Sequence, residues 1–172
     1  MNLPNKLTMA RIFAVPIFVV LYMKAMYIPA CIVFILASIT DMLDGKIARK
    51  YNLVTNFGKI MDPLADKILV YAAFCLMVAD GTVPAWMLII ILFREFAVSG
   101  LRTVAASEGI VIAAGMTGKI KTVLQMFAVP VLLLQMDGIV GIIGQVLLWA
   151  SLVMTIVSGV EYIYNNRQVF SM

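Results

Sequence analysis

Six apolar segments of 18 to 25 residues, divided by short stretches that are polar or chain-breaking, account for most of this 172-residue sequence. A helix needs roughly 20 predominantly apolar residues to cross a bilayer, and each segment is close to that length. We therefore predict an all-α integral membrane protein, a bundle of six transmembrane helices. Their approximate ranges are 7–25, 28–49, 62–79, 83–104, 117–135 and 139–163.

The composition excludes a water-soluble domain. The chain is 63% hydrophobic and only 13% charged, and its mean hydropathy is +1.04. It is too long for a single anchor, and it contains no internal repeat, low-complexity tract or linker. We predict one membrane domain over residues 1–172. A short interfacial segment that contains Pro4 is expected to precede the first span.

The distribution of Lys and Arg predicts the orientation. If the N-terminus faces the cytoplasm, twelve of the thirteen basic residues lie at or near cytoplasmic span ends, and only Lys24 lies at the outer side. Basic residues favour the cytoplasmic side, so we predict that both termini face the cytoplasm and that the protein lies in the cytoplasmic membrane. The net charge of +4 then reflects orientation and contact with anionic lipid. We do not expect nucleic-acid binding, because the basic residues are dispersed among apolar ones.

Four of the nine acidic residues lie in one stretch, DMLDGKIARKYNLVTNFGKIMDPLADK, from Asp41 to Lys67. Asp41 and Asp44 are three apart at the end of the second predicted span, about 60° apart around a helix. Asp62 and Asp66 are four apart at the start of the third, about 40° apart. Each pair therefore faces one way, and a short loop brings the two pairs towards each other.

Four carboxylates at membrane depth need compensation, because each costs at least ~2.5 kcal/mol at the centre of a span. Helix capping explains Asp62 at most, because Asp62 is at a helix start. Asp41 and Asp44 lie at the C-terminal end of a helix, where the helix dipole disfavours anions. The chain has no histidine, which removes the usual zinc sites and the Ser-His-Asp arrangement. Oxygen ligands suit Mg²⁺ or Mn²⁺, and two such ions form a known clamp for displacement at phosphorus. We therefore predict a two-metal site for phosphorus chemistry.

Eight residues of this stretch have a distinctive spacing. They read Asp41-x-x-Asp44-Gly45-x-x-Ala48-Arg49 and, after eight further residues, Gly58-x-x-x-Asp62-x-x-x-Asp66. This spacing resembles the signature of the CDP-alcohol phosphatidyltransferase family at every fixed position. The resemblance implies a six-span membrane domain that works as a homodimer, with its site facing the cytoplasm. It also implies transfer of a phosphatidyl group from a CDP-linked lipid to an alcohol, with release of CMP.

The resemblance implies a role for each motif residue. The four aspartates would hold two Mg²⁺ or Mn²⁺ ions. Asp66 would also be the catalytic base that takes the proton from the acceptor hydroxyl. Gly45, Ala48 and Gly58 would let the CDP-lipid approach the helices closely, and Arg49 would pair with its diphosphate.

A second candidate site consists of basic residues at the cytoplasmic ends of the fourth and fifth spans. These are Arg94 and Arg102 in FREFAVSGLR, and Lys119 and Lys121 in TGKIKTVLQ. A buried basic cluster beside an acidic metal site needs an anion, and a phosphorylated acceptor supplies one, whereas serine or inositol does not. NLPNKLT, MDPLADK, REFAVSGLR and GKIKT resemble the branch of the family that joins CDP-diacylglycerol to glycerol 3-phosphate.

Other interpretations remain open. Within the family, the acceptor could be inositol phosphate or phosphatidylglycerol. Each cation could simply snorkel to the interface, and Arg94 could pair with its neighbour Glu95. A divalent-cation transporter would need polar residues at mid-depth in several spans, but the outer halves here are almost wholly apolar. A non-catalytic lipid-binding or assembly protein could pack through residues 138–144, GIVGIIG, which leaves the aspartates unexplained.

Overall fold

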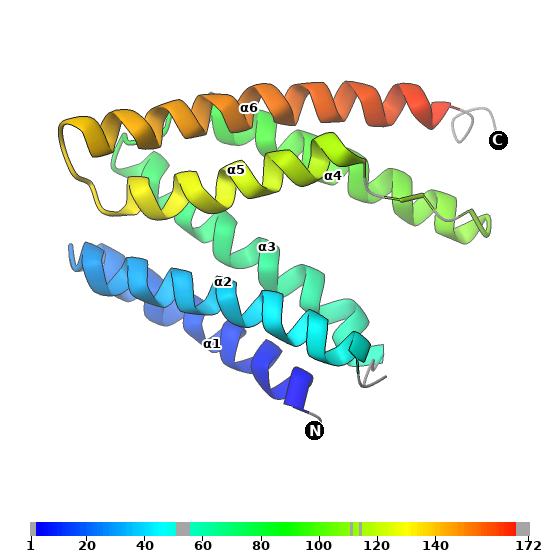
Figure 1. Cartoon of the computed structure of the whole chain (residues 1–172), viewed down its shortest axis with the longest axis horizontal. Helices are drawn as coiled ribbons and strands as arrows, with labels where there is room; N and C mark the ends of the chain where they lie inside the picture. The colour runs from blue at the N-terminus through cyan, green and yellow to red at the C-terminus, as the bar shows by residue number, and fades with distance from the viewer. Residues whose placement is uncertain (1–2, 51–55, 111, 114, 168–172) are drawn as a thin grey trace. The chain divides into compact units, whose positions relative to one another are not determined.

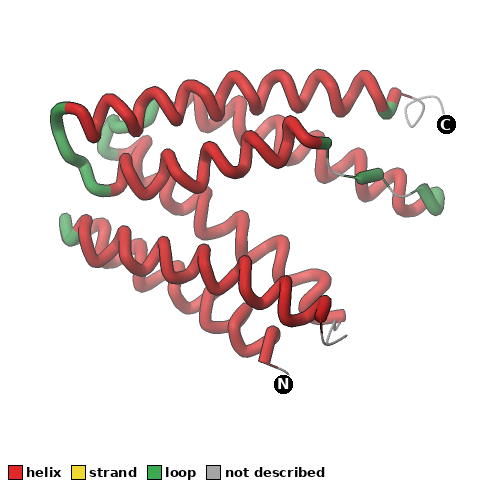
Figure 2. The backbone as a smooth tube through the Cα atoms, in the orientation of Figure 1, coloured by secondary structure: helices red, strands yellow, loops and turns green. Residues whose placement is uncertain are grey.

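The computed structural model describes residues 3–50, 56–110, 112–113 and 115–167. Within the helices, the side chains of residues 3–6, 41–50, 56–60, 62–63 and 66 lie outside the described residues. The described chain forms six α-helices and no strand, as predicted (Figures 1 and 2). The helices are α1 (Leu3–Met23), α2 (Tyr27–Lys50), α3 (Asn56–Ala79), α4 (Ala85–Ser107), α5 (Met116–Leu133) and α6 (Ile139–Asn165).

The helix bounds differ from the predicted spans mainly at two N-terminal ends. Helix α1 runs without a break from Leu3, so the expected leading segment is not a separate element. Pro4 lies in the first turn, where its missing N–H costs no hydrogen bond. Helix α3 begins at Asn56, six residues before the predicted start, because polar residues can continue a helix beyond its apolar part. The apolar segments therefore predict the number of helices better than their ends.

The chain divides into two compact units, and each is described by itself. The first comprises Met1–Thr82 and Val129–Met136, and the second comprises Val83–Ala128 and Asp137–Met172. In the first unit, α1 packs along both α2 and α3; in the second, α4 packs along α6. The prediction of a single membrane domain stays a prediction.

Small and large apolar residues alternate on the buried faces of the first unit. Ala30, Phe34 and Ala37 lie on one face of α2 and are buried, and the Phe34 ring packs against that of Phe18 on α1 in a tilted arrangement, with ring centroids 6.0 Å apart. On α3 the buried residues Ala65, Leu69, Ala73 and Met77 recur every four residues. Small residues let helix backbones approach closely, and such packing stabilises helix pairs even where lipid surrounds them.

Two of the described helices are long and apolar enough to cross a membrane, namely α5 and α6. Three shorter apolar segments of 10–17 residues are Leu7–Met23, Tyr27–Thr40 and Lys67–Ala79. Helix α6 also exposes large apolar side chains such as Val146, Trp149 and Val153, which suits contact with lipid. The all-helical prediction is confirmed, whereas six membrane crossings with both termini inside stay a prediction.

Asp80 joins three chain segments of the first unit through hydrogen bonds. The Tyr22 hydroxyl, at the end of α1, donates to Asp80 Oδ2. Gln135 Nε2, just after α5, donates to the same oxygen at 2.6 Å and to the Tyr22 hydroxyl oxygen at 2.9 Å. Thr82 donates its N–H at 3.0 Å and its hydroxyl at 2.6 Å to Asp80 Oδ1. One carboxylate thus connects the end of α1, the α3–α4 loop and the segment after α5.

These hydrogen bonds change the protonation of Asp80. Partial burial by itself raises the pKa of this carboxyl, but the donors Thr82, Tyr22 and Gln135 stabilise its ionised form. Together they lower the pKa of Asp80 below its ordinary value of 3.8. The carboxylate is therefore ionised at neutral pH.

We expect Asp80→Ala to lower the free energy of unfolding by about 0.5–1.5 kcal/mol at pH 7, because Tyr22, Thr82 and Gln135 lose a hydrogen-bond acceptor on a side chain that is itself exposed. The measurement is chemical or thermal unfolding in detergent. The same exchange at Asp137, which is also exposed and lies in the α5–α6 loop, should change that free energy by less than about 0.5 kcal/mol.

The Asp80 contribution has a defined pH dependence. Because the pKa is lowered in the folded state, the contribution is present above the unfolded value, near 3.8, and is lost as pH falls through the lower folded value. The difference between wild type and Asp80→Ala should therefore shrink only below about pH 4. Equal stability of the two proteins at pH 7 would show that this carboxylate does not hold the segments together.

Candidate functional site

The four predicted metal ligands lie on two helices of the first unit. Asp41 and Asp44 fall in the last ten residues of α2, and Asp62 and Asp66 fall in the first eleven residues of α3. The end of α2 and the start of α3 lie at the same end of this unit, and the two helices are in contact (Figure 1). The backbone thus brings the two pairs to one end, although the four side chains lie outside the described residues.

The remaining motif residues share these helices. Gly45, Ala48 and Arg49 follow the first aspartate pair on α2, and Gly58 precedes the second pair on α3. Their surroundings also lie outside the described residues, so their predicted roles stay predictions. Among the side chains that the structure does describe, no three or more His, Cys, Asp or Glu residues converge as a metal site. The chemistry of the motif, four carboxylates spaced three and four apart on helices, fits a hard divalent cation.

Sequence reasoning missed a buried cation near this end of the unit. Arg11 on α1 is only 2% exposed, and Thr8, three residues earlier on the same helix face, is fully buried. Arg11 lies eight residues from the start of α1, and Asp41 lies nine residues from the end of α2. The helix rise places both about 12–14 Å from their helix ends. The signal available in the sequence for this buried cation was the pair Thr8 and Arg11, two polar residues three positions apart in a mostly apolar segment.

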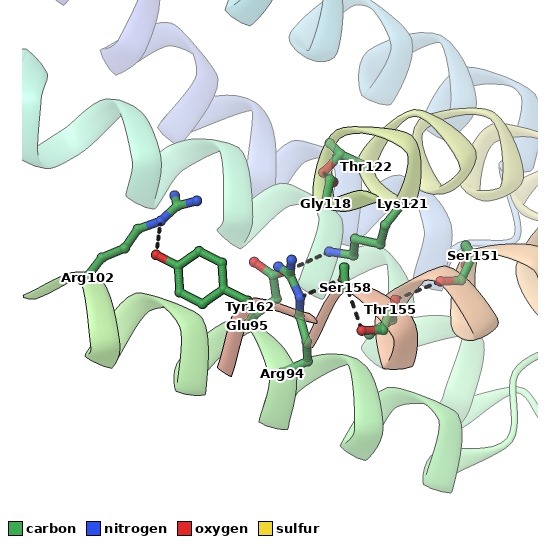
Figure 3. Close-up of polar contacts among 10 residues, drawn as sticks. All are labelled: Arg94, Glu95, Arg102, Gly118, Lys121, Thr122, Ser151, Thr155, Ser158 and Tyr162. Atoms are coloured by element: carbon green, nitrogen blue, oxygen red, sulfur yellow. Dashed lines mark hydrogen bonds and ion pairs between the residues drawn. The ribbon is translucent and has the colours of Figure 1, made fainter. Parts of the chain in front are cut away.

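The second candidate site lies in the second unit, where Glu95 links two cations. Its Oε1 accepts a hydrogen bond from Arg94 Nη1 at 2.8 Å and from Lys121 Nζ at 2.5 Å (Figure 3). The side chains of Arg94, Glu95 and Lys121 are 12%, 13% and 5% exposed. Two positive charges and one negative charge leave this largely buried trio with a net charge of +1.

The Arg94 side chain passes between two glycines. A Cβ atom on Gly159 of α6 would lie 3.1 Å from Arg94 Cγ, and one on Gly118 of α5 would lie 3.0 Å from Arg94 Nη2. Arg94 Nε also donates to the buried Ser158 hydroxyl oxygen at 3.1 Å. Contacts from α4, α5 and α6 therefore hold the guanidinium in place (Figure 3).

The other two predicted acceptor-binding residues lie outside this trio. Arg102 is exposed, and its Nε donates to the Tyr162 hydroxyl oxygen at 3.0 Å. Lys119 is exposed whereas Lys121 is buried, because residues two apart on a helix point about 200° apart. The structure thus brings Arg94 and Lys121 to one carboxylate. It leaves Arg102 and Lys119 on the surface, where their acceptor-binding role stays a prediction.

Sequence reasoning also missed the polar face of α6. Ser151, Thr155, Ser158 and Tyr162 recur at intervals of four, three and four, and all four are buried. The three small hydroxyls donate to carbonyl oxygens of their own helix, at 2.7, 2.7 and 3.1 Å. Ser158 and Tyr162 also accept hydrogen bonds from the two arginines of α4. The helical spacing of these hydroxyls was the available signal.

Nearly the whole chain is similar to a set of known enzymes. A family model described as CDP-alcohol phosphatidyltransferase matches residues 1–157. A Bacillus subtilis (strain 168) protein named CDP-diacylglycerol–glycerol-3-phosphate 3-phosphatidyltransferase is 46% identical, with 96% of this chain and 95% of the relative aligned. A Rickettsia felis protein of the same name is 40% identical over 98% of this chain and 97% of its own. A Mycobacterium tuberculosis (strain H37Rv) protein named probable phosphatidylglycerophosphate synthase is 35% identical over 94% and 80%.

We expect Gly159→Ala to lower the free energy of unfolding by about 1–3 kcal/mol, because the added Cβ would press on Arg94 Cγ, close to the α4 backbone. Unfolding in detergent measures this. The matched control is Gly100→Ala on α4, where a Cβ meets no atom within 4 Å. That variant should be neutral or up to ~1 kcal/mol more stable, since alanine favours helix. If the two variants are equally stable, Arg94 is not held between the glycines.

Proposed function

Because the chain belongs to the CDP-alcohol phosphatidyltransferase family, we propose that it transfers a phosphatidyl group from CDP-diacylglycerol to sn-glycerol 3-phosphate. The products are phosphatidylglycerophosphate and CMP. The structural observation that carries the acceptor is the buried trio of Arg94, Glu95 and Lys121 with its net positive charge. Relatives named for this reaction, similar over nearly the whole chain, support the same acceptor.

The motif aspartates form the reaction centre of this proposal. Asp41, Asp44, Asp62 and Asp66 would hold two divalent cations, Mg²⁺ or Mn²⁺, which would supply charge stabilisation at the diphosphate. Asp66 takes the proton from the acceptor hydroxyl as that oxygen attacks the phosphorus of the phosphatidyl group. The bond from this phosphorus to the bridging oxygen breaks, and CMP leaves with the bond's electrons. The contact between α2 and α3 supports a shared site.

Positively charged residues and small residues of the first unit would bind the CDP-lipid. Arg49 follows the first aspartate pair and pairs with diphosphate oxygens. Gly45, Ala48 and Gly58 carry no large side chain, so that the nucleotide can lie close to the helix backbones. Buried Arg11 on α1 adds a fixed positive charge at a similar depth, which balances part of the acidic charge.

The acceptor phosphate would bind at the basic trio. A phosphate dianion satisfies the net positive charge and can accept hydrogen bonds from both Arg94 and Lys121. Arg102 and Lys119, which are exposed, would raise the local concentration of the anionic acceptor. Inositol phosphate would satisfy the same charges. CMP release measured with glycerol 3-phosphate and with inositol phosphate distinguishes the two acceptors.

We propose a cytoplasmic-membrane protein with six spans, both termini inside and the site facing the cytoplasm, acting as a homodimer. The position of Lys and Arg along the chain supports this orientation, and the two apolar helices α5 and α6 support a location in the membrane. The orientation places the reaction on the side where a charged, water-soluble acceptor is available. The family resemblance supports the homodimer.

We expect Asp66→Asn to abolish CMP release from CDP-diacylglycerol and glycerol 3-phosphate, because an amide cannot accept the hydroxyl proton. The measurement is metal-dependent CMP release by the purified protein in detergent, with binding of CDP-diacylglycerol as a test of folding. Asp137→Asn, the same exchange in an exposed loop, should retain full activity. Full activity of Asp66→Asn would remove the proposed base.

We expect Arg94→Ala to raise the KM for glycerol 3-phosphate by about tenfold to a hundredfold, since a charged hydrogen bond to phosphate is lost. The KM for CDP-diacylglycerol should change by less than about twofold. Arg94→Lys should recover part of the loss because it keeps the charge. Arg167→Ala, at an exposed arginine near the C-terminus, is the control and should have no effect. Equal increases in both KM values would exclude a specific role in acceptor binding.

A further inference from the structure

Gln125 of α5 carries a buried amide that the proposed chemistry does not use. The residue is 5% exposed, and within the described chain no hydrogen-bond acceptor reaches its Nε2 atom. Helix α5 is one of the two helices apolar and long enough to cross a membrane. An unpaired amide donor in such a setting costs free energy, and polar groups inside membrane helices usually serve function.

Gln125 continues the buried face on which Lys121 lies. The two residues are four apart, about 40° apart around the helix and about 6 Å apart along it. Lys121 is 4% exposed and is bound to Glu95, whereas the next residue on this face, Ala128, is fully buried and apolar. Gln125 is therefore the first neutral donor beyond the cations, one helical turn away from the proposed phosphate site.

A neutral amide suits a different part of the acceptor from the part that the cations bind. The cations neutralise a phosphate, while an amide N–H donates to an uncharged oxygen such as a hydroxyl. A phosphorylated polyol such as glycerol 3-phosphate offers both groups on neighbouring carbon atoms, close enough for two side chains one helical turn apart to bind one group each. A site that holds a donor for a substrate hydroxyl rejects an analogue without that hydroxyl, because the donor is then left unpaired.

We infer that the Gln125 amide donates a hydrogen bond to the hydroxyl on the central carbon of the phosphorylated acceptor, so that Gln125 determines specificity for a polyol phosphate. This inference rests on the proposed function, since the phosphate must lie at Arg94 and Lys121. It assigns the orphaned Nε2 atom a partner that arrives with the substrate. It also separates two tasks on α5, with charge recognition at Lys121 and hydroxyl recognition at Gln125.

The test compares two acceptors on two proteins. Glycerol 3-phosphate carries the central hydroxyl, and 3-hydroxypropyl phosphate lacks only that group. We expect wild type to prefer glycerol 3-phosphate in kcat/KM by about tenfold or more. Gln125→Met, which keeps the volume but removes the donor, should abolish this preference by lowering kcat/KM for glycerol 3-phosphate alone. Gln145→Met on α6, the same exchange elsewhere, should leave the preference intact.

The outcomes separate this inference from the proposed function. If wild type does not release CMP with glycerol 3-phosphate, the proposed function fails. If wild type is active and Gln125→Met keeps the full preference for glycerol 3-phosphate, the inference fails and the amide is only structural. Thermal unfolding of Gln125→Met should be unchanged or improved, because a buried unpaired donor is removed. If this variant does not fold, Gln125→Asn, which withdraws the amide by one methylene, should lose the preference; full preference in that variant would overturn the inference.

Discussion

The polar organisation of the second unit depends on one carboxylate in a helix that is otherwise mostly apolar. Glu95 accepts hydrogen bonds from Arg94 on its own helix and from Lys121 on α5. Where water is scarce, a charge needs a countercharge within the protein, and electrostatic attraction is stronger than in water. Within the trio of Arg94, Glu95 and Lys121, one carboxylate for two cations leaves a positive excess. In the proposed function, that excess attracts the anionic acceptor, because a bound phosphate would neutralise the trio more completely.

Each unit uses one carboxylate to join segments that are distant along the chain. In the first unit, Asp80 accepts from Tyr22, Thr82 and Gln135; in the second, Glu95 connects α4 to α5. Apolar faces such as that of α6 can pack in several registers, because lipid competes equally well for their surface. A carboxylate that needs several donors is satisfied in only one register. These polar contacts therefore determine how the helices align, while the small residues determine how closely they approach.

Much of the fold follows from the sequence, and the exceptions have physical causes. The apolar segments predict all six helices, because an apolar run of this length must satisfy its backbone hydrogen bonds internally. They do not predict that α1 begins at Leu3 or α3 at Asn56, since polar turns leave no apolar signal. Likewise, Lys119 and Lys121 look like a pair in the sequence. On the helix they face opposite ways, and only Lys121 is buried.

For the candidate sites, the sequence by itself determined which residues share a helix and how far apart they lie along it. It predicted the aspartate pairs on α2 and α3 and the family that their spacing resembles. On a helix of fixed geometry, the spacing of two residues along the chain determines whether they face the same way. It also suggested the adjacent pair of Arg94 and Glu95. Only the tertiary structure decided that Lys121 shares Glu95, that Arg94 lies between Gly118 and Gly159, and that Gln125 is buried with a free donor. Those facts depend on the distance and rotation between helices, which side-chain packing sets and spacing along a single helix does not.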